Sequence, residues 1–196
     1  MKSLLCFLFV LSTGQVLASL NNSKPVQTVE YVDLNRYTGT WYEVASIPQS
    51  FQKKCVSNSK AQYSLTKGKL IKVVNSCETK TGDTKTAEAR AKVVSTDGSN
   101  SKLKVTFVKI FDWVFSFGGN YWIIALADDY SYAVVGDPTT EYAWILSRTP
   151  QMSQIDLELA AKSLEANGYD TCKLLTTIQD DGFTERKPLC EVVSKN

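Results

Sequence analysis

Short runs of alternating apolar and polar residues fill most of the chain between residues 39 and 148, and turn-forming residues separate them. Runs of this kind, rich in β-branched and aromatic residues, are typical of β-strands. Turn signals such as Asp97-Gly98-Ser99 and Asp137-Pro138 punctuate them. The pattern predicts eight strands, at 39–47, 56–66, 69–77, 85–94, 102–110, 120–127, 132–136 and 142–148.

After residue 150 the period of the pattern changes from strand to helix. Ser153 is suited to cap a helix, with Asp156 three residues on as its capping-box partner. Gly168 is suited to end the helix. One apolar stripe with helical spacing lies between them: Leu157, Ala160, Ala161 and Leu164. Residues 172–179 then read as a last short strand, and 180–196 as a tail.

These elements predict an all-β protein. Eight antiparallel strands in up-and-down order close into a β-barrel that leaves no free edge, with the C-terminal α-helix packed on the outside. A barrel of eight strands has room for about one small ligand. We expect one folded domain over residues 33–196, after a signal peptide at 1–18 and an extended N-terminal arm at 19–32.

The first residues resemble a secretory signal. Lys2 supplies a positive charge, residues 4–11 are apolar, and Val16-Leu17-Ala18 supplies a cleavage site. An uncleaved anchor is the alternative, but the apolar run is shorter than the roughly 20 residues of a membrane span. We therefore expect a secreted protein, extracellular, or periplasmic if the source is bacterial. A glycosylation sequon at Asn21 matters only if the source glycosylates.

Cleavage of the signal removes Cys6 and leaves an even number of cysteines: Cys55, Cys77, Cys172 and Cys190. In an exported chain these predict two disulfides, with three connectivities open. A metal site is the competing interpretation, but the chain has no histidine and no C-x-x-C pair. We expect no metal and no cofactor.

Composition narrows the function. The net charge of +2 is too small to indicate a nucleic-acid partner. The absence of histidine excludes Ser-His-Asp and Cys-His catalysis, and two disulfides would leave no free thiol. We therefore expect a protein that is not an enzyme.

Three short motifs then resemble those of the lipocalin family. Gly39-Thr40-Trp41 resembles its G-x-W motif on the first strand, and Asp129-Tyr130 resembles the end of its second motif, between the sixth and seventh strands. Arg148 resembles its third motif, at the end of the eighth strand. The order and spacing match from about residue 33 to 190, and the fuller strings look most like the bacterial-lipocalin and apolipoprotein D branch.

The resemblance implies roles for several residues. Trp41 would plug the closed end of the barrel, with Arg148 across its indole face, so both would be structural. The apolipoprotein D branch also suggests a disulfide between Cys55 and Cys190, which leaves Cys77 to pair with Cys172. The crossed pairing, Cys55 with Cys172 and Cys77 with Cys190, stays open.

Alternation along the strands selects the residues that face the barrel interior. The parity of Trp41 puts Glu43, Ala45 and Ile47 inside. Arg148 shares parity with Leu146, Trp144 and Tyr142, and Asn75 shares a face with Val73 and Ile71. The resemblance makes Tyr63 a cavity tyrosine, with Ala61 and Leu65 on its face, and Leu103 and Val105, with Phe107, face inward on the fifth strand. The ligand candidates are Glu43, Tyr63, Asn75, Phe107, Trp113, Phe115, Tyr142 and Trp144.

The alternative is that these side chains fill the barrel as hydrophobic core and contact no ligand. We expect this alternative for Leu103 and Val105. Glu43 is costly inside a barrel unless it is paired or neutral. It either binds a ligand head group or contacts an internal tyrosine.

The segment 110–117 is unusually apolar for a loop, and it would lie at the barrel mouth. Trp113, Phe115 and Phe117 alternate along it, and apolar patches of this kind mark ligand, membrane or partner contacts. We expect the 111–117 loop to gate the cavity or to make transient membrane contact. The alternative is that it folds inward as a cap on the core.

Three functions follow from the sequence. The leading one is the binding and transport or storage of a small hydrophobic ligand: a fatty acid, lysophospholipid, sterol-like molecule or tetrapyrrole. The second, implied by the resemblance, is a lipocalin-fold enzyme that acts on a lipophilic substrate; the isomerase type of that family needs a free cavity cysteine. The third is an interaction protein that uses the aromatic mouth loop. We expect a monomer or a weak homodimer.

Overall fold

The computed structural model of this chain describes residues 24–68 and 70–193. The predicted signal peptide at 1–18, Cys6 and the sequon at Asn21 lie outside the described residues.

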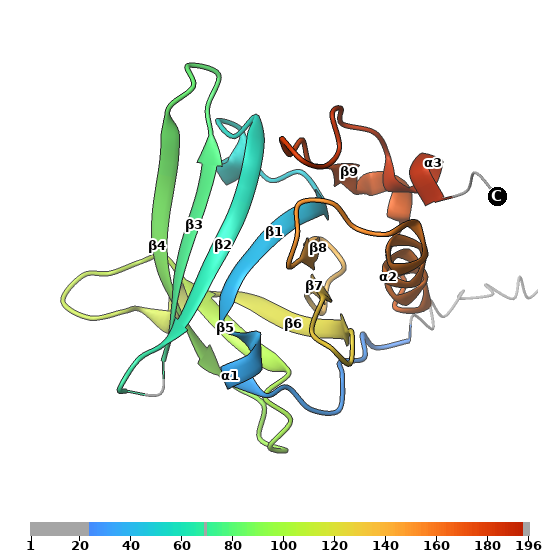
Figure 1. The fold of residues 1–196 in the computed structure, drawn as a ribbon. Coiled ribbons are helices and arrows are strands. Elements are labelled where there is room, and N and C mark those ends of the chain that lie inside the picture. The colour runs from blue at the N-terminus through green and yellow to red at the C-terminus, as the bar shows by residue number, and fades with distance from the viewer. Residues whose placement is uncertain (1–23, 69, 194–196) are drawn as a thin grey trace, which may run out of the picture.

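Eight strands close into an antiparallel barrel, as the alternating pattern predicts (Figure 1). Each strand pairs with the next along the chain, and the first pairs with both the eighth and the second. Their bounds are β1 Gly39–Ser46, β2 Ser57–Leu65, β3 Ile71–Glu78, β4 Thr84–Val93, β5 Lys102–Thr106, β6 Gly119–Leu126, β7 Tyr132–Gly136 and β8 Ala143–Ser147. The fifth strand ends at 106 rather than 110, because the chain turns there into a separate hairpin.

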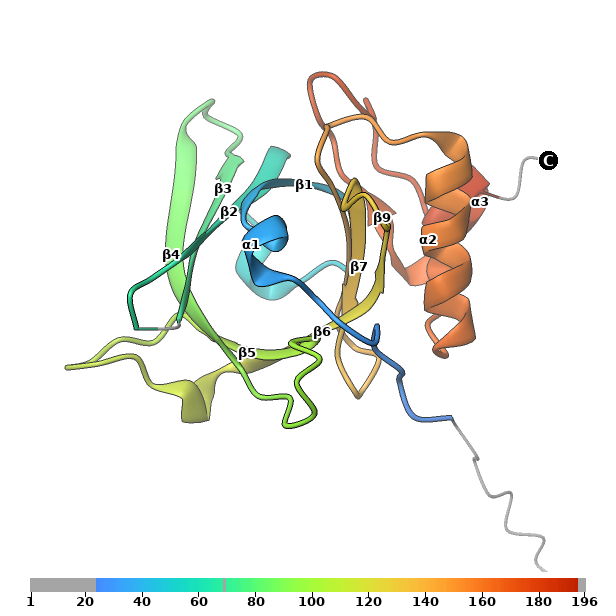
Figure 2. The same ribbon diagram turned by 60° about the horizontal axis from the view of Figure 1, so that its bottom comes forward.

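The barrel has a closed end, covered by the short helix α1 (Leu34–Tyr37). Asp33 caps this helix by accepting a hydrogen bond from the backbone N–H of Asn35. Seen from that end, α1 lies over the centre of the barrel (Figure 2). The loops 47–56 and 137–142 belong to the opposite, open end.

A β-bulge in β1 changes which residues face inward. Glu43 pairs with Leu146 and Ala45 pairs with Ile145, so Val44 is an extra residue on this strand. Beyond it the parity reverses. Ala45 and Ile47 therefore pack in the outer core, and the prediction that they face the interior was wrong.

Helix α2 (Gln154–Ala166) packs on the outside of the barrel beside β7 (Figures 1 and 2). Ser153 caps it by accepting from the backbone N–H of Asp156, and Gly168 follows with φ of +82°. The predicted stripe is buried against the outer faces of the strands, which confirms the helix and its orientation: Leu157, Ala160, Ala161 and Leu164.

The remaining elements are short. They are the 3-10 helices η1 (Ser50–Gln52), η2 (Phe115–Phe117) and η3 (Thr171–Lys173), the strand β9 (Leu175–Thr176) and the helix α3 (Leu189–Val193). β9 is shorter than the predicted 172–179, and the tail contains a helix that the sequence did not indicate. β9 pairs with β1 at Ala45 and Ser46, where β1 has separated from β2.

Gly136 lets the C-terminal segment approach the barrel. A Cβ atom there would lie 2.1 Å from the hydroxyl of Tyr169. That hydroxyl accepts from the backbone N–H of Asp137 and donates to its carbonyl, both at 2.8 Å. The absence of a side chain at 136 is therefore what allows Tyr169 to dock on β7.

The disulfides join near neighbours in sequence. Cys55 is bonded to Cys77 and Cys172 to Cys190. The pairing suggested by the resemblance, Cys55 with Cys190, was wrong, although all four cysteines are used. Cys55 and Cys77 lie where the paired strands β2 and β3 meet the open end, since backbone bonding joins Val56 to Glu78.

The described part of the N-terminal arm is tied to the barrel. Val26 is buried in the outer core, and the backbone N–H of Val32 donates to the carbonyl of Ser99. Within residues 24–68 and 70–193, no helix has the length and apolar character to cross a membrane.

Candidate functional site

The floor of the barrel is built around Trp41. Its side chain is fully buried, and its indole N–H donates to the carbonyl of Tyr37 at 2.8 Å. The guanidinium carbon of Arg148 lies 3.7 Å from the centre of the indole ring. Arg148 also donates to the carbonyls of Thr40 and Arg36. A desolvated cation–π contact of this kind contributes about 2 kcal/mol, so the expected contact between Trp41 and Arg148 is confirmed.

Burial lowers the pKa of Arg148, because it disfavours the charged form. Gly39 leaves room for this side chain: it has φ of +98°, and a Cβ atom there would lie 3.2 Å from Nη1 of Arg148.

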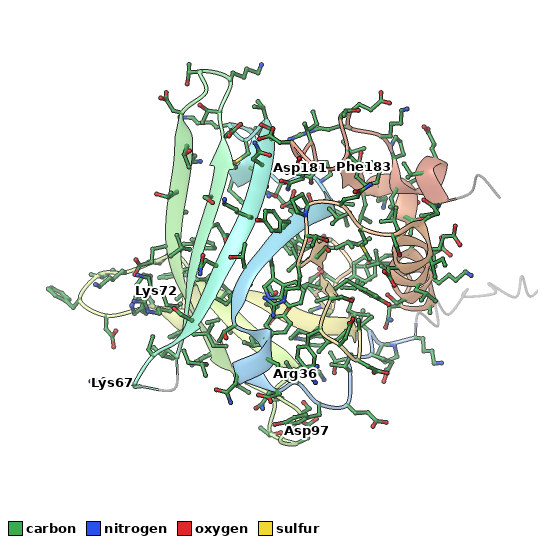
Figure 3. The ribbon with its side chains drawn as sticks, in the orientation of Figure 1. Arg36, Lys67, Lys72, Asp97, Asp181 and Phe183 are labelled. Carbon is green, nitrogen blue, oxygen red and sulfur yellow. A yellow bond between two sulfur atoms is a disulfide. The ribbon has the colours of Figure 1, made fainter. Side chains whose placement is uncertain are left out.

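The second motif locks the same end. Tyr130 has φ of +64°, accepts from the backbone N–H of Asp33, and lies under the guanidinium of Arg36 at 3.9 Å. Asp129 accepts from the backbone N–H of Ser131, and hydrogen bonds from the side chain and the backbone of Ser131 lower the pKa of its carboxyl. Figure 3 shows Arg36 and Asp97 at this end, with Asp181 and Phe183 at the opposite end.

Three tyrosines stand above the floor as one hydrogen-bonded group. The hydroxyl of Tyr121 lies 2.9 Å from that of Tyr37 and 3.2 Å from that of Tyr63. Each phenol carries one hydrogen, so two hydrogen bonds leave one hydrogen for another acceptor. The group therefore has one hydrogen-bond donor left for another molecule in the interior.

Burial also keeps these phenols neutral. It raises the pKa of Tyr63 to about 12, and it also raises the pKa values of Tyr37 and Tyr121 above the usual range. The cause is desolvation, which disfavours the phenolate. The tyrosines therefore act as donors and acceptors near neutral pH, and not as anions.

The wall formed by β2, β3 and β4 is lined with small residues. Asn75 pairs with Ala61 on one side and with Ala87 on the other, so these three side chains share the inner face. Val73 likewise pairs with Tyr63 and Ala89. Alanine beside Asn75 on both neighbouring strands leaves space in front of its amide.

Exposure rises from the floor toward the mouth. Tyr63, Leu103 and Leu146 are buried in the interior core, whereas Trp144, packed against that core, is half-buried. Its ring stacks on Tyr142, with ring centres 6.2 Å apart. Phe107 follows the last residue of β5 and is half-exposed. The predicted inward parity of Leu146 and Trp144 is confirmed, and the contact of Asn75, Tyr142, Trp144 and Phe107 with a ligand stays a prediction.

The interior is closely packed at the tyrosines. A void of about 10 Å³ lies there, lined by Tyr37, Tyr63, Ile71, Ala91, Leu103, Val105 and Tyr121. Any larger molecule must therefore lie above this layer, against the half-exposed residues near the mouth.

Glu43 is buried and faces the open end of β1. Its carboxylate accepts from the hydroxyls of Ser46 at 2.9 Å and Thr177 at 2.7 Å, and from the amide of Gln52 at 2.8 Å. None of these three donors is a tyrosine, so the expected alternative of an internal tyrosine partner was wrong.

The aromatic hairpin 107–118 lies partly on the outer wall. The guanidinium carbon of Arg90 lies 4.8 Å from the ring centre of Trp113, and Nζ of Lys92 lies 4.6 Å from that of Phe115. Arg90 and Lys92 alternate on β4 with Ala89, which belongs to the interior core, so they face outward. Trp113 and Phe115 thus pack against the outer wall, whereas Phe117 is 72% exposed. The contact of Trp113 and Phe115 with a ligand stays a prediction.

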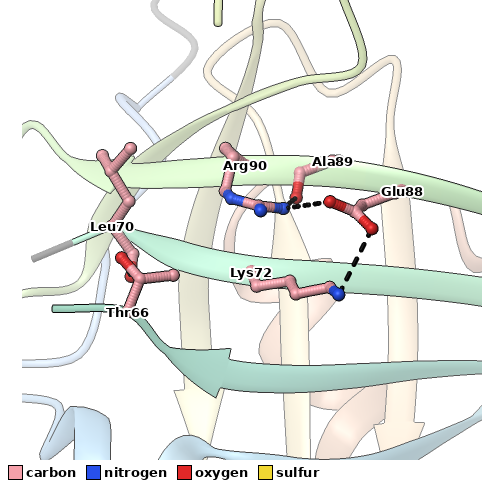
Figure 4. Close-up of polar contacts among 6 residues, drawn as sticks. All are labelled: Thr66, Leu70, Lys72, Glu88, Ala89 and Arg90. Atoms are coloured by element: carbon pink, nitrogen blue, oxygen red, sulfur yellow. Dashed lines mark hydrogen bonds and ion pairs between the residues drawn. The ribbon is translucent and has the colours of Figure 1, made fainter. Parts of the chain in front are cut away.

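Polar contacts between side chains of β3 and β4 lie on this outer face (Figure 4). Arg90 donates to Glu88 at 2.7 Å, and Nζ of Lys72 lies 3.3 Å from the other oxygen of that carboxylate. These two contacts hold the pKa of Glu88 below its usual value. Arg90 is thereby fixed as a platform for the indole of Trp113.

Sequence reasoning missed several residues that the fold brings together. Tyr121 joins Tyr63 and Tyr37 in the interior. Its alternation with Ile123 along β6 was the signal that could have placed it there. Gln52 and Thr177 reach Glu43 from a loop and from the C-terminal segment, and no local pattern indicates such contacts. Within the described residues, no group of three or more Cys, Asp or Glu side chains is placed to hold a metal ion.

Residues 32–179 match the family described as "Lipocalin-like domain". The chain is 34% identical over 163 residues to temperature-induced lipocalin-1 of Arabidopsis thaliana, covering 83% of this chain and 87% of that protein. It is 36% identical to the outer membrane lipoprotein Blc of Vibrio cholerae, covering 80% and 88%. It is also 36% identical to apolipoprotein D of Rattus norvegicus, covering 80% and 81%.

Solved structures share the fold at lower identity. Insecticyanin from the tobacco hornworm Manduca sexta aligns with a TM-score of 0.61 at 21% identity, covering 83% of this chain and 93% of that one. Apocrustacyanin C2 aligns with a TM-score of 0.58 at 18% identity, covering 76% and 81%.

A barrel with a plugged floor, an apolar wall and one open end defines a ligand-binding β-barrel. The matched domain and the relatives make the assignment specific: this chain belongs to the lipocalin family. Its members bind small hydrophobic ligands and are generally binding proteins rather than enzymes.

Proposed function

We propose that this protein binds one small hydrophobic molecule in the upper part of its barrel and transports or stores it. The observation that carries this proposal is the gradient along the inner wall, from a sealed floor at Trp41 to half-exposed Asn75 and Trp144. Apolar pockets with a few oriented polar groups are typical of small-molecule sites. The ligand is a fatty acid, lysophospholipid, sterol-like molecule or tetrapyrrole.

The tyrosines and alanines give this site its shape. The group of Tyr37, Tyr63 and Tyr121 offers one donor to an acceptor on the buried end of the ligand. The alanines around Asn75 make room for a chain or ring. The protein acts by enclosing the ligand and needs no cofactor.

The test compares two tryptophans on opposite faces of the wall. Trp144 packs against the interior core, whereas Trp122 packs against the outer core. We expect Trp144→Ala to weaken binding of a fluorescent fatty acid about tenfold or more, and Trp122→Ala to leave it unchanged at matched folding. Equal affinities for the two variants would refute an interior site.

We also propose that the protein acts outside the cytoplasm. The apolar segment at 4–11 and the cleavage signal at Ala18 support export, and disulfides persist in oxidising compartments. Intact-mass measurement of the exported protein is expected to show a chain that starts at Ser19 and carries two disulfides. A full-length chain with free thiols would contradict this.

The tip of the 107–118 hairpin supports a second proposal, transient contact with a membrane. Phe111 is fully exposed, Ile110 is 67% exposed and Phe117 is 72% exposed, and Lys109 adds a positive charge on the same hairpin. Moving an aromatic side chain from water into lipid is favourable by about 1.5–3 kcal/mol.

The hairpin offers a matched pair of double variants. Phe111→Ser with Phe117→Ser removes exposed rings, so it should reduce binding to anionic lipid vesicles without lowering the melting temperature. Trp113→Ser with Phe115→Ser removes packed rings, so it should lower the melting temperature. Unchanged vesicle binding by the first double variant would exclude membrane contact through this tip.

A further inference from the structure

A second cavity, lined mostly by polar residues, lies at the open end of β1 and shares no lining residue with the interior void. It has a volume of about 260 Å³ and lies between β1, the 48–55 loop and the C-terminal segment. Its walls are Glu43, Ser46, Pro48, Gln49, Gln52, Lys53, Cys55, Ser59, Leu175, Thr176, Thr177 and Arg186. This volume is ample for a molecule of several non-hydrogen atoms.

The buried part of this cavity has more acceptors than donors. The carboxylate of Glu43 accepts three hydrogen bonds, all from neutral donors, and an ionised carboxylate has about four acceptor positions. No lysine or arginine of the described chain forms an ion pair with it. Burying a carboxylate is costly unless a cation or several donors compensate it.

Gln52 adds a second acceptor with no partner. Its amide nitrogen donates to Glu43, which fixes the orientation of the amide because a carboxylate accepts only from the nitrogen. Its Oε1 atom is buried and has no hydrogen-bond partner among the described residues. Glu43 and Gln52 both line the cavity, so each unused acceptor position belongs to a residue of its wall.

The outer part of the cavity is cationic. Lys53 and Arg186 are both exposed and both line it. Nη2 of Arg186 donates to the carbonyl of Cys55 at 3.0 Å, which anchors the guanidinium beside the opening. The cavity therefore places acceptors at its buried end and positive charges at its exposed end.

We propose that this cavity binds a small zwitterion. Its ammonium group donates to Glu43 and to Oε1 of Gln52, and its anionic group lies toward Arg186 and Lys53. A primary ammonium is suited to the buried end because it supplies a positive charge and three donors. This site does not depend on the hydrophobic ligand, because neither Asn75 nor Trp144, which are assigned to that ligand, lines this cavity.

Calorimetric titration with three small probes tests the proposal on the full mature chain. β-Alanine carries both charges, 3-aminopropanol carries only the ammonium, and propionate carries only the carboxylate. We expect β-alanine to bind most tightly, 3-aminopropanol more weakly and propionate not at all. No saturable binding of β-alanine, or equal binding of propionate, would overturn the proposal whatever the result with fatty acids.

Variants then assign the two ends. Glu43→Gln keeps the size of the side chain and should weaken β-alanine about tenfold or more, since hydrogen bonds to a charged acceptor are the strong ones. Arg186→Met should weaken β-alanine and leave 3-aminopropanol unchanged. Glu30→Gln, an exposed carboxylate that does not line the cavity, is the matched control.

If Glu43→Gln does not fold, Gln52→Met provides the same test, because it removes the unpartnered acceptor. Unchanged β-alanine affinity in a folded Glu43→Gln or Gln52→Met variant would overturn the assignment. Titration with free O-phosphoethanolamine and with a single-chain lipid that carries the same head group separates two sources of the zwitterion. Binding of the free compound supports a soluble ligand, and binding of the lipid alone supports a head group.

Discussion

Single side chains divide the barrel into a part that stabilises the fold and a part available to a ligand. Trp41 is fully buried, and its indole is held by Tyr37 and covered by Arg148. Trp144 lies nearer the mouth and keeps part of its surface exposed. Two tryptophans on the same inner face thus have different consequences when they are removed.

Trp41→Ala is expected to lower the free energy of unfolding by about 3–5 kcal/mol, the usual cost of truncating a buried tryptophan. Urea unfolding followed by circular dichroism measures it. Tyr31→Phe, at an exposed tyrosine, serves as the control. A loss below about 1 kcal/mol would contradict the role of Trp41 as the plug of the floor.

The buried tyrosines predict a loss of stability at high pH. The pKa of Tyr63 is raised to about 12 in the folded protein, above the value of about 10 expected in the unfolded chain. The unfolded state therefore releases its proton first, so the contribution is complete below pH 10 and is lost as the pH rises from about 10 to 12.

Tyr63→Phe should make this decline shallower, by about 2–3 kcal/mol over that range. The measurement is urea unfolding of both proteins at several values between pH 9 and pH 12. If the free energy of unfolding falls with pH equally in wild type and variant, the phenol of Tyr63 has the same pKa in the folded and unfolded states, which would contradict the prediction.

At the scale of elements, alternation and turn signals were sufficient to predict the eight strands, the helix and most inward faces. They failed at β1, because the extra residue Val44 reverses the parity that Trp41 sets, and a bulge has no signature in an alternating run. They also failed for the 107–118 hairpin. Its packing on Arg90 and Lys92 is a long-range contact that composition does not encode.

The docking of the C-terminal segment on β7 depends on one small residue. Gly136→Ala would place a methyl group against the hydroxyl of Tyr169 and the side chain of Ile124. We expect a loss of about 1–3 kcal/mol in the free energy of unfolding, the typical cost of overpacking. Gly119→Ala is the matched control, because nothing lies within 4 Å of a Cβ atom there. Equal stability of the two variants would contradict the close approach.

For the whole molecule, the disulfides hold the segments that surround the open end. Cys55–Cys77 ties the loop before β2 to the end of β3, and Cys172–Cys190 ties η3 to α3 around the segment that contains Arg186. The sequence established that all four cysteines pair, but the connectivity depends on which strands are neighbours in the closed barrel. Resemblance to one branch of the family was a poor guide to it.

Replacing Cys172 and Cys190 together by serine should therefore lower the free energy of unfolding by about 3 kcal/mol, as the chain-entropy account gives for a loop of this size. Peptide mapping under non-reducing conditions tests the pairing itself. Recovery of a peptide that joins Cys55 to Cys190 would contradict the described connectivity.

The central claim is that the ligand occupies the space in front of Asn75, inside the barrel. Ala87 and Thr86 are neighbours on β4: Ala87 pairs with Asn75 on the inner face, whereas the side chain of Thr86 is exposed. Ala87→Trp places an indole ring inside the barrel, whereas Thr86→Trp places the same ring on the outer surface. Both variants are titrated with a fluorescent fatty acid. We predict that Ala87→Trp abolishes one-to-one binding while Thr86→Trp retains the wild-type affinity. Full binding by a folded Ala87→Trp variant would contradict an interior ligand site.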